Sequence, residues 1–305
     1  MTTRVCVVGC GAIGSLYAAH LARVEGVEVW AVDPWADHVD AINAGGLRVT
    51  GRDSFVAPVH ARTSAADVPA CELGVVATKA EHTRVAVAAC ADVFADAAVA
   101  SVQNGLGNEE VLAELVPRVI RGTILPAGAV TEPGVVRYDA PGETWLGPFE
   151  PKPASGSEIS DLAELLSRGG LPTDALADAR GPQWDKVVLN SATSPLAALT
   201  GLPMGPLCSD PAIRVEIDAL VAEARAVCAA LGIELSDVSA RIDEAIEVAH
   251  DHQPSMLQDV LARRRTEIDV LNGGVAAQGR LAGVPTPRHD AMVALVHGLE
   301  RSWDS

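Results

Sequence analysis

The sequence predicts an α/β protein in which a doubly wound N-terminal sheet is followed by an all-helical C-terminal domain. In the first half, short continuous apolar runs alternate with amphipathic helical stretches, a pattern typical of parallel strands covered by helices on both faces. Beyond Gly181 no strand pattern remains, and apolar residues recur at helical spacing. The length of 305 residues indicates two domains, which we expect at 1–178 and 179–305.

The elements of the first half follow from local composition. Four strands are expected where apolar, mostly β-branched residues run continuously, at 5–8, 27–32, 73–77 and 99–102. Residues 123–136 and 145–147 predict a later, partly antiparallel extension of this sheet, with a turn at Glu132-Pro133-Gly134. Residues 148–157, rich in Pro, Gly and Ser, predict a loop. A helix at 159–167 and a short strand near Thr173 complete this half.

The second half predicts helices only. Their expected ranges are 185–199, 211–231, 238–250, 255–262, 266–281 and 288–303. Pro195 lies inside the first of them and predicts a kink, because proline cannot donate the helical hydrogen bond. We expect ligands to bind in a cleft between the two halves.

Composition excludes several classes of function. The formal net charge of −17 and the pI of about 4.8 oppose binding to nucleic acid or to anionic lipid. The six cysteines are scattered and predict neither disulfides nor a zinc site. His250 and His252 have no supporting cluster, so we expect no metal. The glycines near the N-terminus argue against a signal peptide, and no long apolar run suggests a membrane span, so we expect a cytoplasmic protein.

A glycine-rich segment follows the first strand directly. Gly9-Cys10-Gly11-Ala12-Ile13-Gly14 has the spacing of a Rossmann dinucleotide-binding turn, with a strand before it and a helix after it. The second strand ends at Asp33, 19 positions beyond Gly14. A carboxylate there can accept both ribose hydroxyls and would repel a 2′-phosphate. The expected cofactor is therefore NAD(H). NADP(H) stays open, because Asp33 could instead be a helix-start residue.

The chain has only three lysines, Lys79, Lys152 and Lys186. Lys152 lies between two prolines and indicates a loop. Thr78-Lys79 and Asn104 follow two of the expected strands, where the carboxyl ends of parallel strands border a ligand crevice. Asn104 precedes a glycine and could equally be an ordinary turn residue. Incidental surface lysines are the alternative for Lys79 and Lys186.

Lys186, Asn190 and Ser194 recur every four residues and should share one face of a helix. Apolar neighbours would desolvate Lys186 and lower its pKa toward use as an acid. Ser255 begins a capping-box pattern, and Glu267 follows a second expected helix start. On the pattern alone, those structural roles are favoured over functional ones for Ser255 and Glu267.

Taken together, these motifs resemble the ketopantoate reductase family over almost the whole chain. The matching segments are Gly9-Cys10-Gly11-Ala12-Ile13-Gly14, Thr78-Lys79-Ala80, Gln103-Asn104-Gly105-Leu106-Gly107, Trp184-Asp185-Lys186 with Asn190, Pro195-Leu196, Ser255-Met256-Leu257-Gln258-Asp259, and Thr266-Glu267-Ile268-Asp269 with Asn272-Gly273. Their joint order and spacing are specific. The Lys186 and Asn190 pair alone also resembles other β-hydroxyacid dehydrogenases.

The resemblance implies hydride transfer from a nicotinamide cofactor to a 2-keto acid, giving a 2-hydroxy acid. Lys186 would be the general acid, and Glu267 would hold the substrate hydroxyl. The remaining substrate contacts would come from Lys79, Asn104, Asn190, Ser194 and Ser255. The cofactor contacts would come from Gly9, Gly11, Ala12, Ile13, Gly14, Asp33, Thr78, Lys79 and Asn104.

Three departures from the family pattern matter: the first argues against NADP, and the other two leave the substrate open. Asp33-Pro34 stands where NADP-using members carry Arg, Ser194 stands where a second Asn is common, and His252 replaces a frequent Asn. A paralogue acting on a different keto acid or on a C=N substrate is one alternative. A non-catalytic NAD-binding sensor is another, although a sensor has no need for an acid at Lys186. Assembly as a homodimer also stays open.

Overall fold

The computed structural model describes residues 2–304, which form two compact units. The first comprises residues 2–103 and Asn108–Ala179. The second comprises Asn104–Gly107 and residues 180–304. The segment that carries Asn104 therefore belongs to the helical unit, although strands of the first unit both precede and follow it in the sequence.

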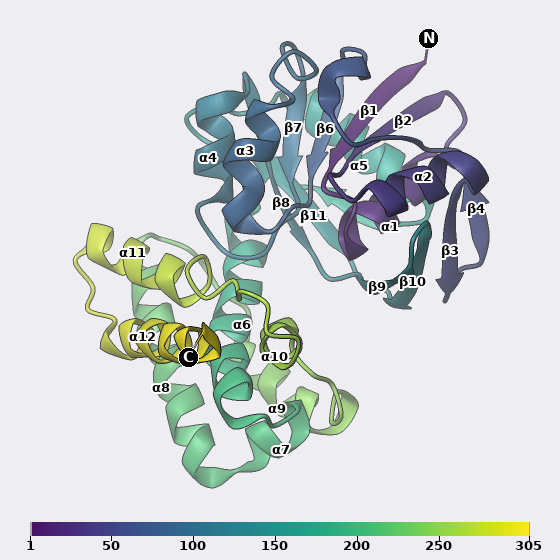
Figure 1. The fold of residues 1–305 in the computed structure, drawn as a ribbon. Coiled ribbons are helices and arrows are strands. Elements are labelled where there is room, and N and C mark those ends of the chain that lie inside the picture. Colours follow the sequence, from purple (N-terminus) through teal and green to yellow (C-terminus); the bar gives the residue numbers. More distant parts are fainter. Residues whose placement is uncertain (1, 305) are drawn as a thin grey trace. The chain divides into compact units, whose positions relative to one another are not determined.

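An eight-stranded sheet forms the centre of the first unit (Figure 1). Its strands, in spatial order, are β12 (Thr173–Ala175), β11 (Thr144–Pro148), β8 (Arg118–Ile124), β7 (Ala98–Ser101), β6 (Leu73–Val76), β1 (Thr3–Val8), β2 (Val27–Val32) and β5 (His60–Arg62). All neighbours are parallel except β11, which runs antiparallel to β8. The predicted α/β class and the antiparallel addition are confirmed.

Helices cover both faces of this sheet, as the continuous apolar strands predict. They are α1 (Ala12–Leu21), α2 (Ala36–Gly45), α3 (Thr83–Ala88), α4 (Asn108–Leu115), α5 (Gly156–Gly169) and the short 3₁₀ turns η1 (Ala65–Asp67) and η2 (Ala80–His82). Side chains of β1 alternate between two cores. Val5 and Val7 pack in the core that contains α1 and α5, whereas Cys6 and Val8 pack in the core that contains α3 and α4.

A separate four-stranded sheet corrects one part of the prediction. It consists of β4 (Phe55–Ala57), β3 (Leu47–Gly51), β10 (Val135–Ala140) and β9 (Ala127–Glu132), in that order. Residues 123–136 were expected to extend the main sheet, and 123–124 do so as the end of β8. The predicted turn at Pro133-Gly134 instead folds β9 and β10 into a hairpin, and β10 pairs with β3 of the separate sheet. Local patterns predict the hairpin but not the strand with which it pairs.

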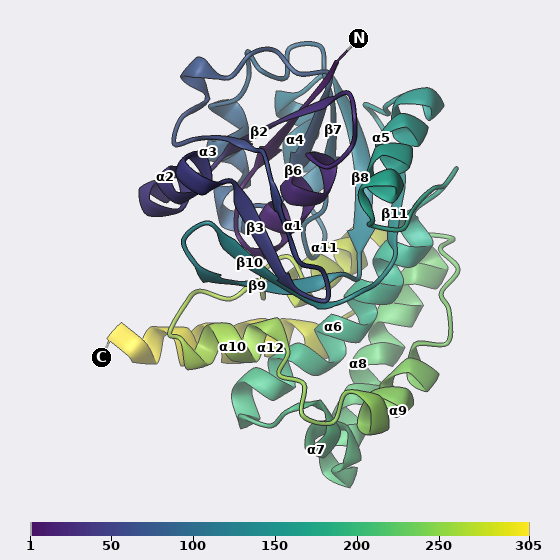
Figure 2. The same cartoon turned by 90° about the vertical axis from the view of Figure 1, so that its right-hand side faces the viewer.

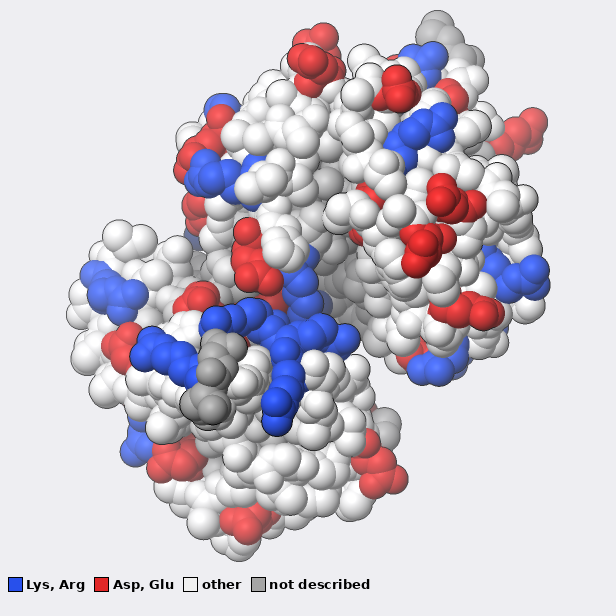
Figure 3. Space-filling model, viewed as in Figure 1, with Lys and Arg blue, Asp and Glu red and all other residues white. Residues whose placement is uncertain are grey.

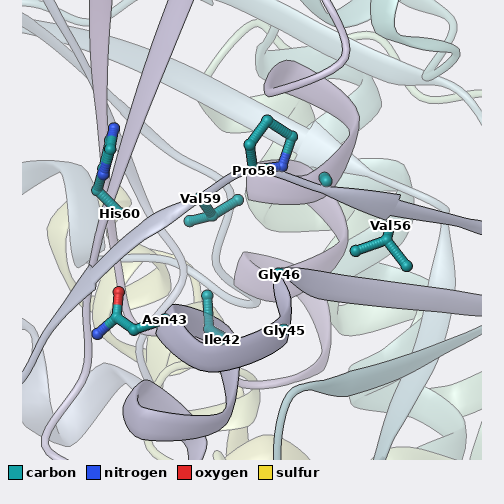
Figure 4. Close-up of a pocket in the computed structure, with 9 residues that line it drawn as sticks. Ile42, Asn43, Gly45, Gly46, Val56, Pro58, Val59 and His60 are labelled. Atoms are coloured by element: carbon teal, nitrogen blue, oxygen red, sulfur yellow. The ribbon is translucent and has the colours of Figure 1, made fainter.

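An open pocket of about 460 Å³ lies in the first unit, between the C-terminal end of α2 and the segment that runs from β4 to the start of β5 (Figure 4). Ile42 and Val59 contribute apolar surface to it. None of the residues predicted for catalysis or cofactor binding lines this pocket.

The second unit is helical (Figures 1 and 2). Its helices are α6 (Arg180–Thr200), α7 (Met204–Ser209), α8 (Pro211–Ala230), α9 (Val238–Val248), α10 (Ser255–Leu261), α11 (Asn272–Ala282) and α12 (Pro287–Arg301), with a terminal 3₁₀ turn η3 (Ser302–Asp304). Its apolar core joins α6 to α8, α10, α11 and α12. Across residues 2–304, no helix combines the length and the apolar character needed to cross a membrane.

Several helix predictions need correction. Helix α6 begins at Arg180 rather than at 185 and continues through Pro195, so Lys186 lies in its second turn. The short helix α7 was not predicted. Helix α11 begins at Asn272 rather than at 266, so Thr266 and Glu267 do not start a helix. The proposed capping box at Ser255 is also wrong, because the N-cap of α10 is Pro254 and makes no side-chain cap.

Candidate cofactor and active site

The glycine-rich segment forms the turn between β1 and α1. Gly9 has a φ of +90°, and a Cβ on it would lie 2.8 Å from the backbone nitrogen of Thr78. A Cβ on Gly14 would collide with the carbonyl oxygen of Gly9. Both glycines are therefore required by the packing of the protein itself. Ala12 and Ile13 begin α1 directly behind this turn.

Gly11 is different, because nothing in the protein explains its missing side chain. Its φ of −66° is ordinary, and apart from its chain neighbours no described atom lies within 4 Å of a Cβ placed there. The backbone at Gly11 is thus open to the close approach of a ligand, at the N-terminus of α1 where phosphate groups bind. The turn fits the pyrophosphate of a dinucleotide.

Asp33 lies at the end of β2 and contacts the glycine turn. Its Oδ2 accepts a hydrogen bond from the Cys10 N–H at 2.7 Å, and its Oδ1 accepts one from the Trp35 N–H at 2.9 Å. Each carboxylate oxygen retains acceptor capacity for a hydroxyl. The carboxylate is therefore fixed in place beside the turn, as recognition of a ribose requires.

Thr78 and Lys79 lie between β6 and η2, where Lys79 is the N-cap of η2. The buried amide of Gln103 holds this connection. Its Nε2 donates to the Thr78 carbonyl at 2.9 Å and to the Thr83 hydroxyl at 2.7 Å. Ser101 Oγ donates to the Gln103 Oε1 at 3.3 Å. The sequence analysis placed Gln103 in a motif that follows a buried strand, but it assigned Gln103 no role of its own.

In the second unit, the structure brings together Lys186, Glu267 and Asn104. The Asn104 Nδ2 donates to the Glu267 Oε2 at 3.1 Å. Burial lowers the pKa of Lys186 to about 8, while the nearby carboxylate of Glu267 acts in the opposite direction. The expected desolvation of Lys186 is confirmed, and an ammonium that can lose its proton near neutral pH adjoins a carboxylate that can accept hydrogen bonds.

The other predicted substrate residues occupy the same helical unit. Asn190 and Ser194 follow Lys186 by one and two turns of α6, and Ser194 is only 3% exposed. Ser255 is exposed at the first turn of α10, a helix that packs against α6. His252 is exposed in the loop before α10.

Asn272 and His289 form a buried polar pair. The sequence did not predict this contact. Asn272 Nδ2 donates to the Ser191 carbonyl at 2.9 Å and to His289 Nδ1, which lies 3.2 Å away. His289 Nε2 must carry the ring proton, because it lies 3.1 Å from the Leu220 carbonyl. This pair joins α6, α8, α11 and α12. Its contact on α6 is Ser191, the residue that follows Asn190. The sequence analysis included Asn272-Gly273 in a motif but assigned Asn272 no role of its own.

Positive charge gathers locally in spite of the acidic composition. Three exposed arginines, Arg263, Arg264 and Arg265, precede Thr266 and Glu267. Figure 3 shows basic side chains gathered on one face of the second unit. Arg264 Nε bonds Asp259 at 3.1 Å and Arg265 Nη1 bonds Glu300 at 3.0 Å. Two of the three arginines before Glu267 are therefore paired with carboxylates.

Comparison with known proteins identifies the family. The profile described as "Ketopantoate reductase PanE/ApbA" matches residues 5–151, and that of the C-terminal part of the same family matches residues 178–300. The chain belongs to the ketopantoate reductase family. A 2-dehydropantoate 2-reductase of Pyrococcus horikoshii is 32% identical, with 97% of each chain covered.

Solved structures agree with this assignment. A PanE/ApbA family ketopantoate reductase from Ralstonia eutropha has a TM-score of 0.89 and 30% identity, covering 99% of this chain and all of that one. A ternary complex of D-mandelate dehydrogenase with NADH and anilino(oxo)acetate has a TM-score of 0.90 and 26% identity, again covering 99% of this chain and all of that one. The fold predicted by the resemblance is confirmed.

Proposed function

We propose that this protein reduces a 2-keto acid to the 2-hydroxy acid with a nicotinamide cofactor, preferring NAD(H). The observation that carries the proposal is the group formed by Lys186, Glu267 and Asn104, in which a lysine with a lowered pKa adjoins a fixed carboxylate. The names of the relatives, 2-dehydropantoate 2-reductases, support the reaction type.

Each residue of the site has a separate role in the proposed reduction. The bound nicotinamide supplies the hydride, which would be transferred to the substrate C2. Negative charge then develops on the former carbonyl oxygen, and Lys186 would stabilise it and donate a proton to it. Glu267, held by Asn104, would accept a hydrogen bond from the substrate hydroxyl. Asn190, Ser194 and Ser255 would orient the substrate, and Lys79 and Thr78 would serve the cofactor side.

The choice of NAD(H) rests on Asp33. Its carboxylate is held at the glycine turn by the Cys10 and Trp35 N–H groups, and a 2′-phosphate placed there would meet a fixed negative charge. The structural neighbour that binds NADH supports the same choice. A cytoplasmic location and a place in pantothenate biosynthesis stay predictions, as does a homodimer.

Two different substrates are supported by different observations. The curated relatives favour ketopantoate. Ser194 favours a bulkier 2-keto acid, because this buried side chain is shorter than the asparagine common in the family, and the mandelate dehydrogenase neighbour binds an aryl-bearing oxo acid analogue. Initial rates with ketopantoate and with aryl and branched 2-keto acids, each with NADH and NADPH, test the proposal. No turnover with any pair would refute it.

A further inference from the structure

Trp35 is an exposed aromatic side chain beside the nucleotide fingerprint. It lies two residues after Asp33, is the N-cap of α2 and is 42% exposed. Its backbone N–H donates to the same Asp33 carboxylate that accepts from the Cys10 N–H of the glycine turn. Trp35 is thus fixed at its backbone to the residue proposed to bind the ribose.

The indole of Trp35 is also fixed. It stacks on the ring of His38, with 5.0 Å between centroids and 13° between planes. His38 is fully buried, and burial lowers the pKa of its imidazole, which keeps the ring neutral. The Gly134 N–H donates to His38 Nδ1 at 3.0 Å, so the ring proton is on Nε2.

From His38 the contacts lead back to the glycine turn. His38 Nε2 donates to Ser15 Oγ at 3.1 Å, and Ser15 Oγ donates to the Cys10 carbonyl at 2.7 Å. These contacts therefore form a closed circuit that runs through Asp33, Cys10, Ser15, His38 and Trp35. Such bracing reduces the entropy lost when a planar ligand group stacks on the exposed indole.

We propose that Trp35 is the stacking surface for the adenine ring and forms, with Asp33, one preformed adenosine-binding unit. This inference rests on the proposed use of a dinucleotide cofactor. Adenine supplies the flat aromatic face that an indole binds, and its attached ribose supplies the hydroxyls that Asp33 accepts. The nicotinamide half of the cofactor has no part in this unit.

Calorimetric titration of Trp35→Ala tests the assignment, with NADH, ADP-ribose and reduced nicotinamide mononucleotide as ligands. We expect NADH and ADP-ribose to bind about tenfold more weakly, a loss of the order found when a base-stacking aromatic is replaced by alanine. Trp35→Phe should retain most of the affinity. Binding of the mononucleotide, which lacks adenosine, should not change, and because Trp35 is exposed the melting temperature should stay near that of the unmodified protein.

Trp30→Phe is the matched control, because Trp30 lies on β2, shortly before Asp33, but stacks on His60 instead. ADP-ribose should quench indole fluorescence in the unmodified protein and in Trp30→Phe, but much less in Trp35→Phe. Unchanged ADP-ribose affinity in Trp35→Ala would overturn this assignment alone. Failure of the unmodified protein to bind NADH, NADPH or ADP-ribose would overturn the proposed function as well.

Discussion

The pH dependence of turnover provides a quantitative test of Lys186. With a pKa of about 8, Lys186 is mostly protonated at pH 7 and mostly deprotonated at pH 9. If its proton is donated in the slow step, kcat for reduction should fall about tenfold between these pH values. A lysine of ordinary pKa would stay charged over this range, and kcat would be nearly constant.

The measurement is kcat at saturating NADH and substrate in overlapping buffers from pH 6 to 10. Lys186→Ala should lower kcat by about 10²-fold or more, and Lys186→Arg should rescue little, because a guanidinium does not release its proton. Lys152→Ala is the matched control and should behave as the unmodified protein. A profile without a fall between pH 7 and 9, or near-normal kcat in Lys186→Ala, would refute the assignment.

Glu267→Gln adds a second, directional test. The Glu267 carboxylate opposes the lowering of the Lys186 pKa, so removing its charge should move the fall in kcat to lower pH. The amide keeps the size of the side chain and can still bond Asn104. A profile that moves to higher pH, or does not move at all, would contradict the electrostatic coupling of the two residues.

Three further outcomes follow from the structure. NADH should be preferred over NADPH by at least about tenfold in kcat/KM, which corresponds to about 1.4 kcal/mol. The double variant Asp33→Ser with Pro34→Arg should shift the preference toward NADPH. A tenfold preference of the unmodified protein for NADPH would contradict the role of Asp33. Gly11→Ala should leave the melting temperature unchanged yet weaken NADH binding, whereas Gly14→Ala should lower both, because only the second Cβ collides with the protein; equal thermal effects would contradict this distinction. Lys186→Met should raise the melting temperature at pH 7, where the unmodified protein holds a desolvated charge. Because the unfolded chain binds more protons than the folded one between the folded pKa of about 8 and the ordinary value near 10.5, the unmodified protein gains stability across this range and the advantage of Lys186→Met should shrink.

Much of the fold could be predicted because local patterns determine it. The β-branched runs of β1 and β2, the glycine turn and the helical periodicity after Gly181 each indicate one structure. The separate sheet of β3, β4, β9 and β10 could not be predicted, because the pairing of β10 with β3 joins residues far apart in sequence. The start of α11 was misplaced, because Thr266 bonds the distant Glu300 rather than capping a helix.

The candidate site shows the same division. Motif spacing predicted the face of α6 that carries Lys186, Asn190 and Ser194, and apolar neighbours predicted the lowered pKa of Lys186. The contact between Asn104 and Glu267 spans 163 positions and could come only from the tertiary structure. The bracing of Trp35 by His38 likewise depends on a hydrogen bond from Gly134, which no local pattern contains.

The most direct test of the central claim is the transfer of deuterium from [4-²H]NADH to the product. Two NADH samples are used, each deuterated at one of the two C4 positions, because only one of these hydrogens is transferred. With ketopantoate or a bulkier 2-keto acid as substrate, mass spectrometry should detect a 2-hydroxy acid that carries one deuterium at C2. The same incubation with Lys186→Ala should give at least about 10²-fold less labelled product per unit time. Absence of any 2-hydroxy acid, or product without the label from either deuterated face of NADH, would contradict direct hydride transfer to a 2-keto acid.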